Sequence, residues 1–183
     1  MTLEFEVDPQ LTEQLRAEIV ACWADVSNAG GAVGFFPPVR MDDVQPTAQA
    51  QLAGVITGRD RLLVGRTTTG EQPGRLAAFA FLISNSFTGR AHWSTVKSVM
   101  VHPDFQGSGF GYRLMAEIAA VAREAGLEQL HLDCRGGTGN DLFYKKCGYQ
   151  EIGRYAKGIK VPVQRGEERT ASYRDLILMA LEL

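Results

Sequence analysis

The chain has 183 residues and a formal net charge of −2, with 45% hydrophobic and 22% charged residues. This length predicts a single domain, residues 1–183, with room for a full hydrophobic core, and the composition is ordinary for a soluble globular protein. The small net charge and the lack of a long basic run argue against nucleic acid as a partner. No apolar stretch approaches the roughly 18 residues of a membrane span, so we expect no membrane partner.

The cysteines and the N-terminus indicate the compartment. Cys22, Cys134 and Cys147 show no CxxC spacing, so we expect reduced thiols and neither a disulfide framework nor a metal site. The first ten residues, MTLEFEVDPQ, lack the basic-then-apolar pattern of a signal peptide. We therefore expect a cytoplasmic protein, either a monomer or a homodimer.

The first half of the chain predicts two helices and several strands. Pro9 suits the first position of a helix, which the glycines near residue 30 end. A second helix is expected over about 41–56, with a disturbance at Pro46. The strand-like segments are residues 1–7, 61–66, 76–83 and 93–101. Those joined by a short polar turn are expected to pair antiparallel.

The second half predicts helices that alternate with strands. Residues 108–125 place apolar side chains at helical spacing, and Gly126 ends this helix. A strand at 129–134 follows, and the intervening helix implies that this strand runs parallel to the one before it. The remaining segments are a short helix at 140–147, strands at 149–159 and 171–181, and a polar loop at 161–170. The order predicts an α+β fold with a mixed sheet.

A glycine-rich turn connects the strand at 93–101 to the helix that follows it. Gly107, Gly109 and Gly111 can adopt backbone angles that other residues avoid, and they have no Cβ to block a ligand. Amides at the start of a helix lack intrahelical partners and lie at the positive end of the dipole. The turn therefore predicts an anion site, most naturally for a phosphate. The alternative is a turn that binds no ligand.

Two common phosphate-binding motifs do not fit this turn. A P-loop requires Lys followed by Ser or Thr after the glycines, which this sequence lacks. A dinucleotide fingerprint requires Gly or Ala where this chain has Tyr112. The remaining pattern is Gln106-x-x-Gly109-x-Gly111 after a strand that ends in Val-x-Pro. It resembles the coenzyme A pyrophosphate loop of the GNAT superfamily of N-acetyltransferases.

This resemblance implies a fold and a set of coenzyme contacts. The implied fold is a GNAT-like mixed, mostly antiparallel sheet with a central parallel pair of splayed strands, flanked by about four helices. The pantetheine arm of acetyl-CoA would lie in the splay, bonded to the backbones of Val99 and Val101, and an amide there would polarise the thioester carbonyl. The implied coenzyme-binding residues are Val99, Met100, Val101, Gln106, Gly107, Ser108, Gly109, Phe110, Gly111, Tyr112, Asn140 and Tyr144.

A second segment, residues 140–149, resembles the short helix of the same superfamily. Asn140 and Tyr144 are four residues apart, so they share a helix face. In the superfamily the residue at Asn140 bonds the pantetheine arm and the tyrosine points at the thioester sulfur, which makes Tyr144 the general acid. A phenol has a pKa of about 10 and can protonate a departing thiolate of comparable basicity. The alternative is a core tyrosine with a satisfied hydroxyl.

The general base departs from the superfamily pattern. Members often carry a glutamate where this chain has Thr95, and a threonine cannot act as a base. Asp133 is the best replacement, because it lies at the carboxyl end of its strand near the expected splay. Asp133 could instead cap the glycine turn that follows it. His131 and His92 are reserve bases.

Four blocks are together similar to the tabtoxin-resistance type of acetyltransferase, over about residues 10–180. The blocks are residues 30–35, residues 99–103, residues 130–133 and the Phe143-Tyr144 pair. That type acetylates a hydroxyl of a β-lactam toxin through a proposed strand glutamate and aspartate. Asp133 matches the aspartate, but Thr95 replaces the glutamate, so we do not expect the same substrate. The loop at 30–38 would cover the acceptor site with Phe35 and Phe36 as walls, or pack under the first two helices.

Together these motifs predict an enzyme that moves an acetyl group from acetyl-CoA to an amine or hydroxyl of a small molecule. Tyr144 and Asp133 are the expected catalytic residues, and attack on the thioester is direct. A covalent route through Cys134 lacks a base linked to it by spacing. Two alternatives stay open. One is the transfer of a longer acyl group. The other is a non-catalytic acyl-CoA-binding module, which the absence of a glutamate at position 95 favours.

Overall fold

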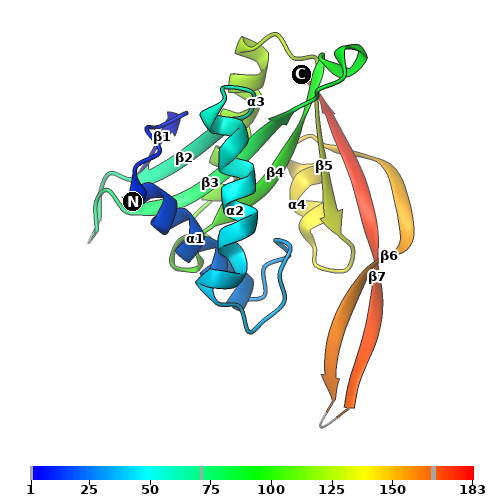
Figure 1. Ribbon diagram of the computed structural model, residues 1–183. Coiled ribbons are helices and arrows are strands. Elements are labelled where there is room, and N and C mark those ends of the chain that lie inside the picture. Colours follow the sequence, from blue (N-terminus) through cyan, green and yellow to red (C-terminus); the bar gives the residue numbers. More distant parts are fainter. Residues whose placement is uncertain (1, 71, 166–167) are drawn as a thin grey trace.

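The computed structural model describes residues 2–70, 72–165 and 168–183. These residues form one seven-stranded sheet in the order β1-β2-β3-β4-β5-β7-β6 (Figure 1). The strands are β1 (Leu3–Val7), β2 (Arg61–Thr67), β3 (Leu76–Ser84), β4 (Trp93–Val101), β5 (Gln129–Arg135), β6 (Gln150–Arg165) and β7 (Glu168–Glu182). Neighbouring strands pair antiparallel except β4 and β5, which are parallel. The predicted mixed α+β sheet is confirmed.

Four α-helices lie against this sheet in the described part of the chain. They are α1 (Glu13–Asn28), α2 (Met41–Ile56), α3 (Phe110–Glu124) and α4 (Asn140–Lys146), with 3₁₀ turns at Thr88–Arg90 and Pro103–Phe105. The pair α1 and α2 packs on one face of the sheet, and α3 and α4 pack on the other (Figure 1). None of these helices combines the length and apolar character needed to cross a membrane.

The two helical layers bury opposite faces of the same strands. On β2, Leu63 joins the apolar cluster under α3, whereas Leu62 and Val64 join the cluster under α1 and α2. A strand buried on both faces has a continuous apolar run instead of an alternating one. On α3, Leu114 and Ile118 are fully buried, and burial of each such side chain contributes about 2 kcal/mol. The core thus fixes the central strands that carry the site.

The two parallel strands separate soon after they pair. Among the described residues, β4 pairs with β5 only at Trp93, Ser94 and Thr95, which lie opposite residues 129–131. Beyond Thr95 the two strands run on without bonding to each other, β4 as far as Val101 and β5 as far as Arg135. The splay implied by the superfamily resemblance is therefore present.

A bulge in β4 lies inside the splay. The register with β3 shifts between Phe79 and Phe81, and Ser98 has a positive φ of 53°. Val96 and Val99 both pack in the cluster under α3, although residues three apart on a regular strand face opposite sides. The extra residue absorbs this change of face. The bulge therefore turns both Lys97 and Ser98 toward one cavity. On a regular strand these two adjacent residues would face opposite sides.

Two helices begin later than the sequence indicated. The first begins at Glu13, not at Pro9, because the Thr12 hydroxyl accepts a hydrogen bond from the Leu15 amide at 3.1 Å and caps it. The third begins at Phe110, not at Ser108, because Gly109 occupies the N-cap with φ 78°. The expected disturbance at Pro46 does not occur, and α2 is continuous through it.

The β6–β7 hairpin is longer than predicted. The polar loop expected over 161–170 is wrong, because β6 continues to Arg165 and β7 starts at Glu168. Residues 166–167 of that expected loop lie outside the described residues. The hairpin projects beyond the rest of the sheet as a two-stranded ribbon (Figure 1). Such a ribbon buries little on either face, so its polar sequence lacks the alternation that identifies a strand.

Candidate active site

Two cavities open where β4 and β5 separate. The glycine-loop cavity, of about 470 Å³, lies against the turn before α3. The bulge cavity, of about 370 Å³, lies beside the bulge of β4. Val99, Asn140 and Tyr144 line both cavities, together with Ala32 and Val33 of the α1–α2 loop. The splay therefore joins two binding spaces at one point.

The glycine turn presents unbonded amides to its cavity. Gly107 and Gly109 have φ values of 77° and 78°, a left-handed conformation that favours glycine. Within the described residues, none of the backbone amides from Gly107 to Tyr112 donates to a protein acceptor. These amides surround the N-terminus of the fifteen-residue helix α3. The arrangement suits a phosphate or pyrophosphate group.

Gly111 requires glycine for a different reason from the one we predicted. It lies in the first turn of α3 with ordinary helical geometry, not in a left-handed conformation. A Cβ at Gly111 would lie 3.2 Å from Cζ of Phe143 on α4. The ring of Phe143 in turn packs 5.0 Å from that of Tyr112 and 5.1 Å from that of Tyr144. Gly111 thus lets α3 approach α4 beside the cavity.

The edge of β4 that faces the splay forms the floor of the glycine-loop cavity. Val99 and Val101 line it, and beyond Thr95 this edge has no strand partner in the described residues. The side-chain amide of Gln106 donates to the Val101 carbonyl at 3.0 Å, which shows that this carbonyl faces the open edge. An extended ligand can therefore bond to this edge as an added strand would.

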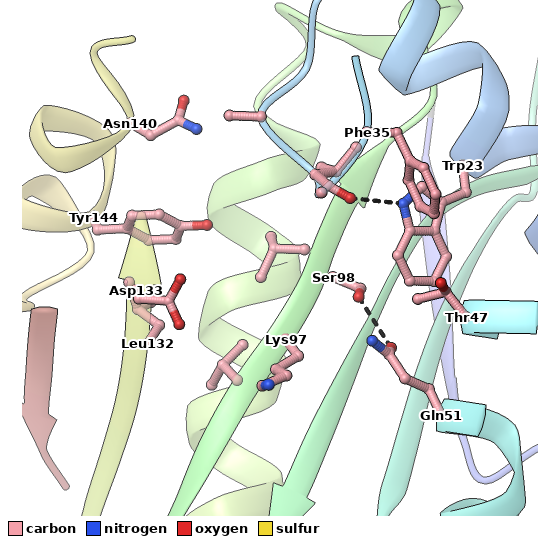
Figure 2. A pocket seen from close by; sticks show the side chains of 15 residues that line it. Trp23, Phe35, Thr47, Gln51, Lys97, Ser98, Leu132, Asp133, Asn140 and Tyr144 are labelled. Carbon is pink, nitrogen blue, oxygen red and sulfur yellow. Dashed lines mark hydrogen bonds between the residues drawn. The ribbon is translucent and has the colours of Figure 1, made fainter. Parts of the chain in front are cut away.

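Tyr144 stands at the junction of the two cavities. Its side chain extends from α4 with the hydroxyl directed into the bulge cavity, below Asn140 on the same helix face (Figure 2). Tyr144 is 9% exposed, and its hydroxyl has no hydrogen-bond partner in the described part of the chain. Burial is the main cause that raises the pKa of Tyr144 above its ordinary value, followed by nearby thiols and Asp133. The phenol therefore keeps its proton at neutral pH.

Asp133 lies on β5 at the same side of the bulge cavity as Tyr144 (Figure 2). Its side chain is exposed and forms no ion pair or hydrogen bond with any residue that the structure describes. It does not cap the glycine turn that follows, where the Thr138 hydroxyl instead donates to the Arg135 carbonyl at 2.7 Å. A carboxylate without a structural partner is available to a ligand or to a proton.

The other residues considered as bases lie away from both cavities. His131 stacks on Trp93 with ring centroids 4.1 Å apart and bonds Gln129 at 3.1 Å. Burial, and then the charge of His92, lower the pKa of His131. Thr95 pairs with His131 across the parallel strands. None of Thr95, His92 and His131 lines the glycine-loop cavity or the bulge cavity.

The wall of the bulge cavity opposite Tyr144 comes from α1 and α2 (Figure 2). Trp23 donates its indole N–H to the Val33 carbonyl at 2.8 Å, and Phe35 packs against Trp23 with ring centroids 6.0 Å apart. The hydroxyl of Ser98 donates to the Gln51 side chain at 2.9 Å. Sequence reasoning identified Phe35 as a wall but missed Trp23, Thr47, Gln51, Lys97 and Ser98. Helical periodicity assigned Trp23 to the core, and no motif marked the others.

Two predicted positions, Met100 and Ser108, lie apart from the glycine-loop cavity and the bulge cavity. Met100 is buried in the cluster under α1 and α2, and its side chain faces away from the splay. Ser108 is exposed and is not among the lining residues of the glycine-loop cavity. The Cys134 thiol is buried 3.9 Å from the Met179 sulfur. Burial, followed by nearby carboxylates, raises the pKa of Cys134 to about 11, so it is a poor nucleophile at neutral pH.

Residues 63–151 match the family model described as "Acetyltransferase (GNAT) domain". This segment of the chain is therefore similar to a GNAT acetyltransferase domain. The matched segment contains the splayed pair β4 and β5, the glycine turn, α3 and α4. It therefore includes the elements that form the glycine-loop cavity, apart from the end of α1 and the α1–α2 loop. No curated protein sequence matches the chain.

Solved acetyltransferase structures share the GNAT fold along the whole chain. An N-acetyltransferase from Staphylococcus aureus Mu50 aligns with a TM-score of 0.75 and 15% identity, over 100% of this chain and 99% of that one. The ribosomal-protein-alanine N-acetyltransferase from Brucella melitensis gives 0.71 and 20%, over all of both chains. The protein yncA from Salmonella typhimurium, solved with its cofactor acetyl-CoA, gives 0.69 and 21%, over 100% and 93%. The similarity to the tabtoxin-resistance type stays a prediction.

Proposed function

We propose that this protein is a GNAT acetyltransferase that transfers an acetyl group from acetyl-CoA to an amine or hydroxyl of a small molecule by direct attack. The observation that carries the proposal is the meeting of two cavities at Val99, Asn140 and Tyr144. One cavity has unbonded amides at a helix N-terminus, and the other has the carboxylate of Asp133. Two substrates that enter from opposite sides would meet at Tyr144.

The glycine-loop cavity supports the binding of coenzyme A. The amides from Gly107 to Tyr112 suit its pyrophosphate, because their N–H groups have no other acceptor in the described residues. The unpartnered edge of β4 at Val99 and Val101 suits its extended pantetheine arm, and the Asn140 side chain lies across from this edge. The acetyl group would then lie at the junction of the cavities.

The chemistry requires one proton to leave the acceptor and one to reach the sulfur. In this proposal Asp133 takes the proton of the attacking amine or hydroxyl, directly or through a water. An amide on the open edge of β4 donates to the carbonyl oxygen as negative charge develops there. Tyr144 then protonates the departing thiolate. The same apolar surroundings that keep Tyr144 protonated also raise the basicity of that thiolate, so their proton affinities stay matched.

The direct test is a screen of amines and hydroxyl compounds that follows release of the CoA thiol, with acetyl-CoA and longer acyl-CoA donors in parallel. We expect turnover with acetyl-CoA and with at least one small acceptor. Calorimetry on the same preparation measures acetyl-CoA binding. Tight binding without turnover across the screen would indicate an acyl-CoA-binding module, and no binding would overturn the proposal.

A further inference from the structure

The acceptor side of the site extends beyond the bulge cavity. A third cavity of about 330 Å³, here called the hairpin cavity, lies under the α1–α2 loop at the base of the β6–β7 hairpin. It shares Ala32, Gly34, Phe35 and Asp133 with the bulge cavity. Arg135, at the end of β5, lines its far side. A molecule whose amine lies at Asp133 therefore has room to reach Arg135.

Arg135 is a cation without a counter-charge among the residues that the structure describes. It is half-buried, and its guanidinium forms no ion pair or hydrogen bond within the described part of the chain. The guanidinium carbon lies 5.3 Å from the centre of the Phe36 ring, a stacking that fixes its position. Burial, and then the positive charge of Arg174, lower the pKa of Arg135 below its ordinary value. Both causes disfavour an unpaired cation at this position, so a bound anion would stabilise it.

The nearby acidic residue on the neighbouring strand β7 already has hydrogen-bond partners. Asp175 accepts hydrogen bonds from the Arg154 side chain at 3.1 Å and from the Lys157 amide at 3.0 Å. Arg154 also binds Glu151 at 2.9 Å. Glu151 and Asp175 thus pair with Arg154, and neither pairs with Arg135.

Asp133 and Arg135 together form a charge pattern. They are two residues apart on β5, so their side chains leave the same face of the strand about 6.6 Å apart. They do not form an ion pair with each other, because Arg135 is stacked on Phe36. One unpaired carboxylate and one unpaired guanidinium therefore line one continuous space.

We propose that the acceptor is an amine that also carries a carboxylate, with the amine at Asp133 and Tyr144 and the carboxylate on Arg135. This inference rests on the proposed acetyl transfer. A guanidinium donates two parallel hydrogen bonds to a carboxylate, a geometry that gives both affinity and orientation. The shared wall of Phe35 and Phe36 would cover the apolar part of the molecule between its two charged ends.

Lys97 provides the matched control. It is the other cation that lines the acceptor side, and it likewise has no ion-pair partner among the described residues. Lys97 is exposed, whereas Arg135 is half-buried and held by Phe36. Fixing a free lysine side chain costs more conformational entropy for each hydrogen bond formed. We therefore assign the carboxylate to Arg135.

The test compares 4-aminobutanoate, 5-aminopentanoate and 6-aminohexanoate, each with its own carboxamide. Binding to the complex of the protein with CoA is measured by NMR titration, and acetyl transfer by thiol release. In the parent protein at least one acid should bind about tenfold tighter than its amide, because a charge-assisted hydrogen bond contributes at least that much. Arg135→Gln should remove this preference, Arg135→Lys should retain part of it, and Lys97→Gln should leave it unchanged.

Either of two outcomes would overturn the inference while leaving acetyl transfer intact. One is equal binding of every acid and its amide by the parent protein. The other is an unchanged preference for the acid in Arg135→Gln. Loss of the preference in Lys97→Gln alone would move the carboxylate to Lys97. Acetyl-CoA affinity and melting temperature should match the parent in all three variants, which excludes misfolding. Because the titration needs no turnover, failure of acetyl transfer is detected separately by the thiol assay.

Discussion

The glycine-loop cavity and the acceptor-side cavities are built in different ways. The hydrogen-bonding groups of the first are mostly backbone groups, namely the amides from Gly107 to Tyr112 and the free edge of β4 at Val99 and Val101. The acceptor side is mostly side chains, which come from α1, the α1–α2 loop, α2, β4 and β5. Backbone hydrogen-bonding groups stay the same when most side chains are replaced, so a site made of them keeps binding the same ligand as the sequence varies. A side-chain site can change its specificity without altering the fold.

Tyr144 belongs to both regions, so it should give the largest effect on turnover. Tyr144→Phe keeps the ring packing against Phe143 and removes the proton donor. We expect kcat to fall by about 10²–10⁴-fold with little change in acetyl-CoA affinity.

Tyr149→Phe is the matched control for Tyr144→Phe. The Tyr149 ring lies 5.9 Å from the Tyr144 ring, and its buried hydroxyl has no partner in the part of the chain that the structure describes. Removal of that hydroxyl should leave kcat unchanged and raise stability by about 1 kcal/mol. Equal losses of kcat in both variants, measured with chemistry rate-limiting, would assign Tyr144 to packing.

A change in the glycine turn should affect the binding of acetyl-CoA and not the binding of the acceptor. Gly109→Glu introduces a carboxylate beside the proposed pyrophosphate site and strains a residue with φ 78°. Loss of charge-assisted hydrogen bonds of about 2–3 kcal/mol should weaken acetyl-CoA binding by about 100-fold in calorimetry. Gly58→Glu, at φ 70° in the turn after α2, imposes similar strain far from the cavity and should bind normally. Unchanged binding in Gly109→Glu would remove the glycine turn from the coenzyme site.

Replacement of Asp133 should lower turnover of the acceptor without changing the binding of the coenzyme. Asp133→Asn is nearly isosteric but cannot accept a proton at neutral pH, so turnover should fall by about tenfold or more. The loss should be greatest at lower pH, where acceptor amines are charged. Acetyl-CoA affinity and melting temperature should stay the same, and Asp42→Asn, at an exposed position of α2, should behave as the parent. Parental turnover in Asp133→Asn would assign the proton to solvent or to another group.

The cysteines should give the smallest effect. Burial raises the pKa of Cys134 and of Cys147 to about 11, and that of Cys22 to about 12. A raised pKa means less thiolate, so at pH 8 iodoacetamide should react slowly with the folded protein and rapidly after denaturation. Cys134→Ala should keep kcat within about threefold of the parent. A burst of acetylated Cys134 in mass spectrometry would instead support a covalent route.

The glycine turn and the helix face of α4 that line the glycine-loop cavity could be predicted from short segments, because their signals are local. Glycines at 107 and 109 mark left-handed turns, and the spacing of Asn140 and Tyr144 places both on one helix face. The strands of the buried sheet were also predictable, and β4 has the predicted bounds. The β6–β7 hairpin was not, because a solvated ribbon needs no apolar alternation.

The sequence by itself determined the segments that form strands, the glycine turn and the helix face that carries Tyr144, since each depends on neighbours within a few residues. Only the tertiary structure decided the acceptor side. The bulge at Ser98 turns Lys97 toward the cavity, α1 brings Trp23 across from Tyr144, and the α1–α2 loop sets Phe36 on Arg135. The last two of these arrangements bring together residues about 120 and about 100 positions apart. Such distant contacts are set by how the helices pack on the sheet, which no local pattern encodes.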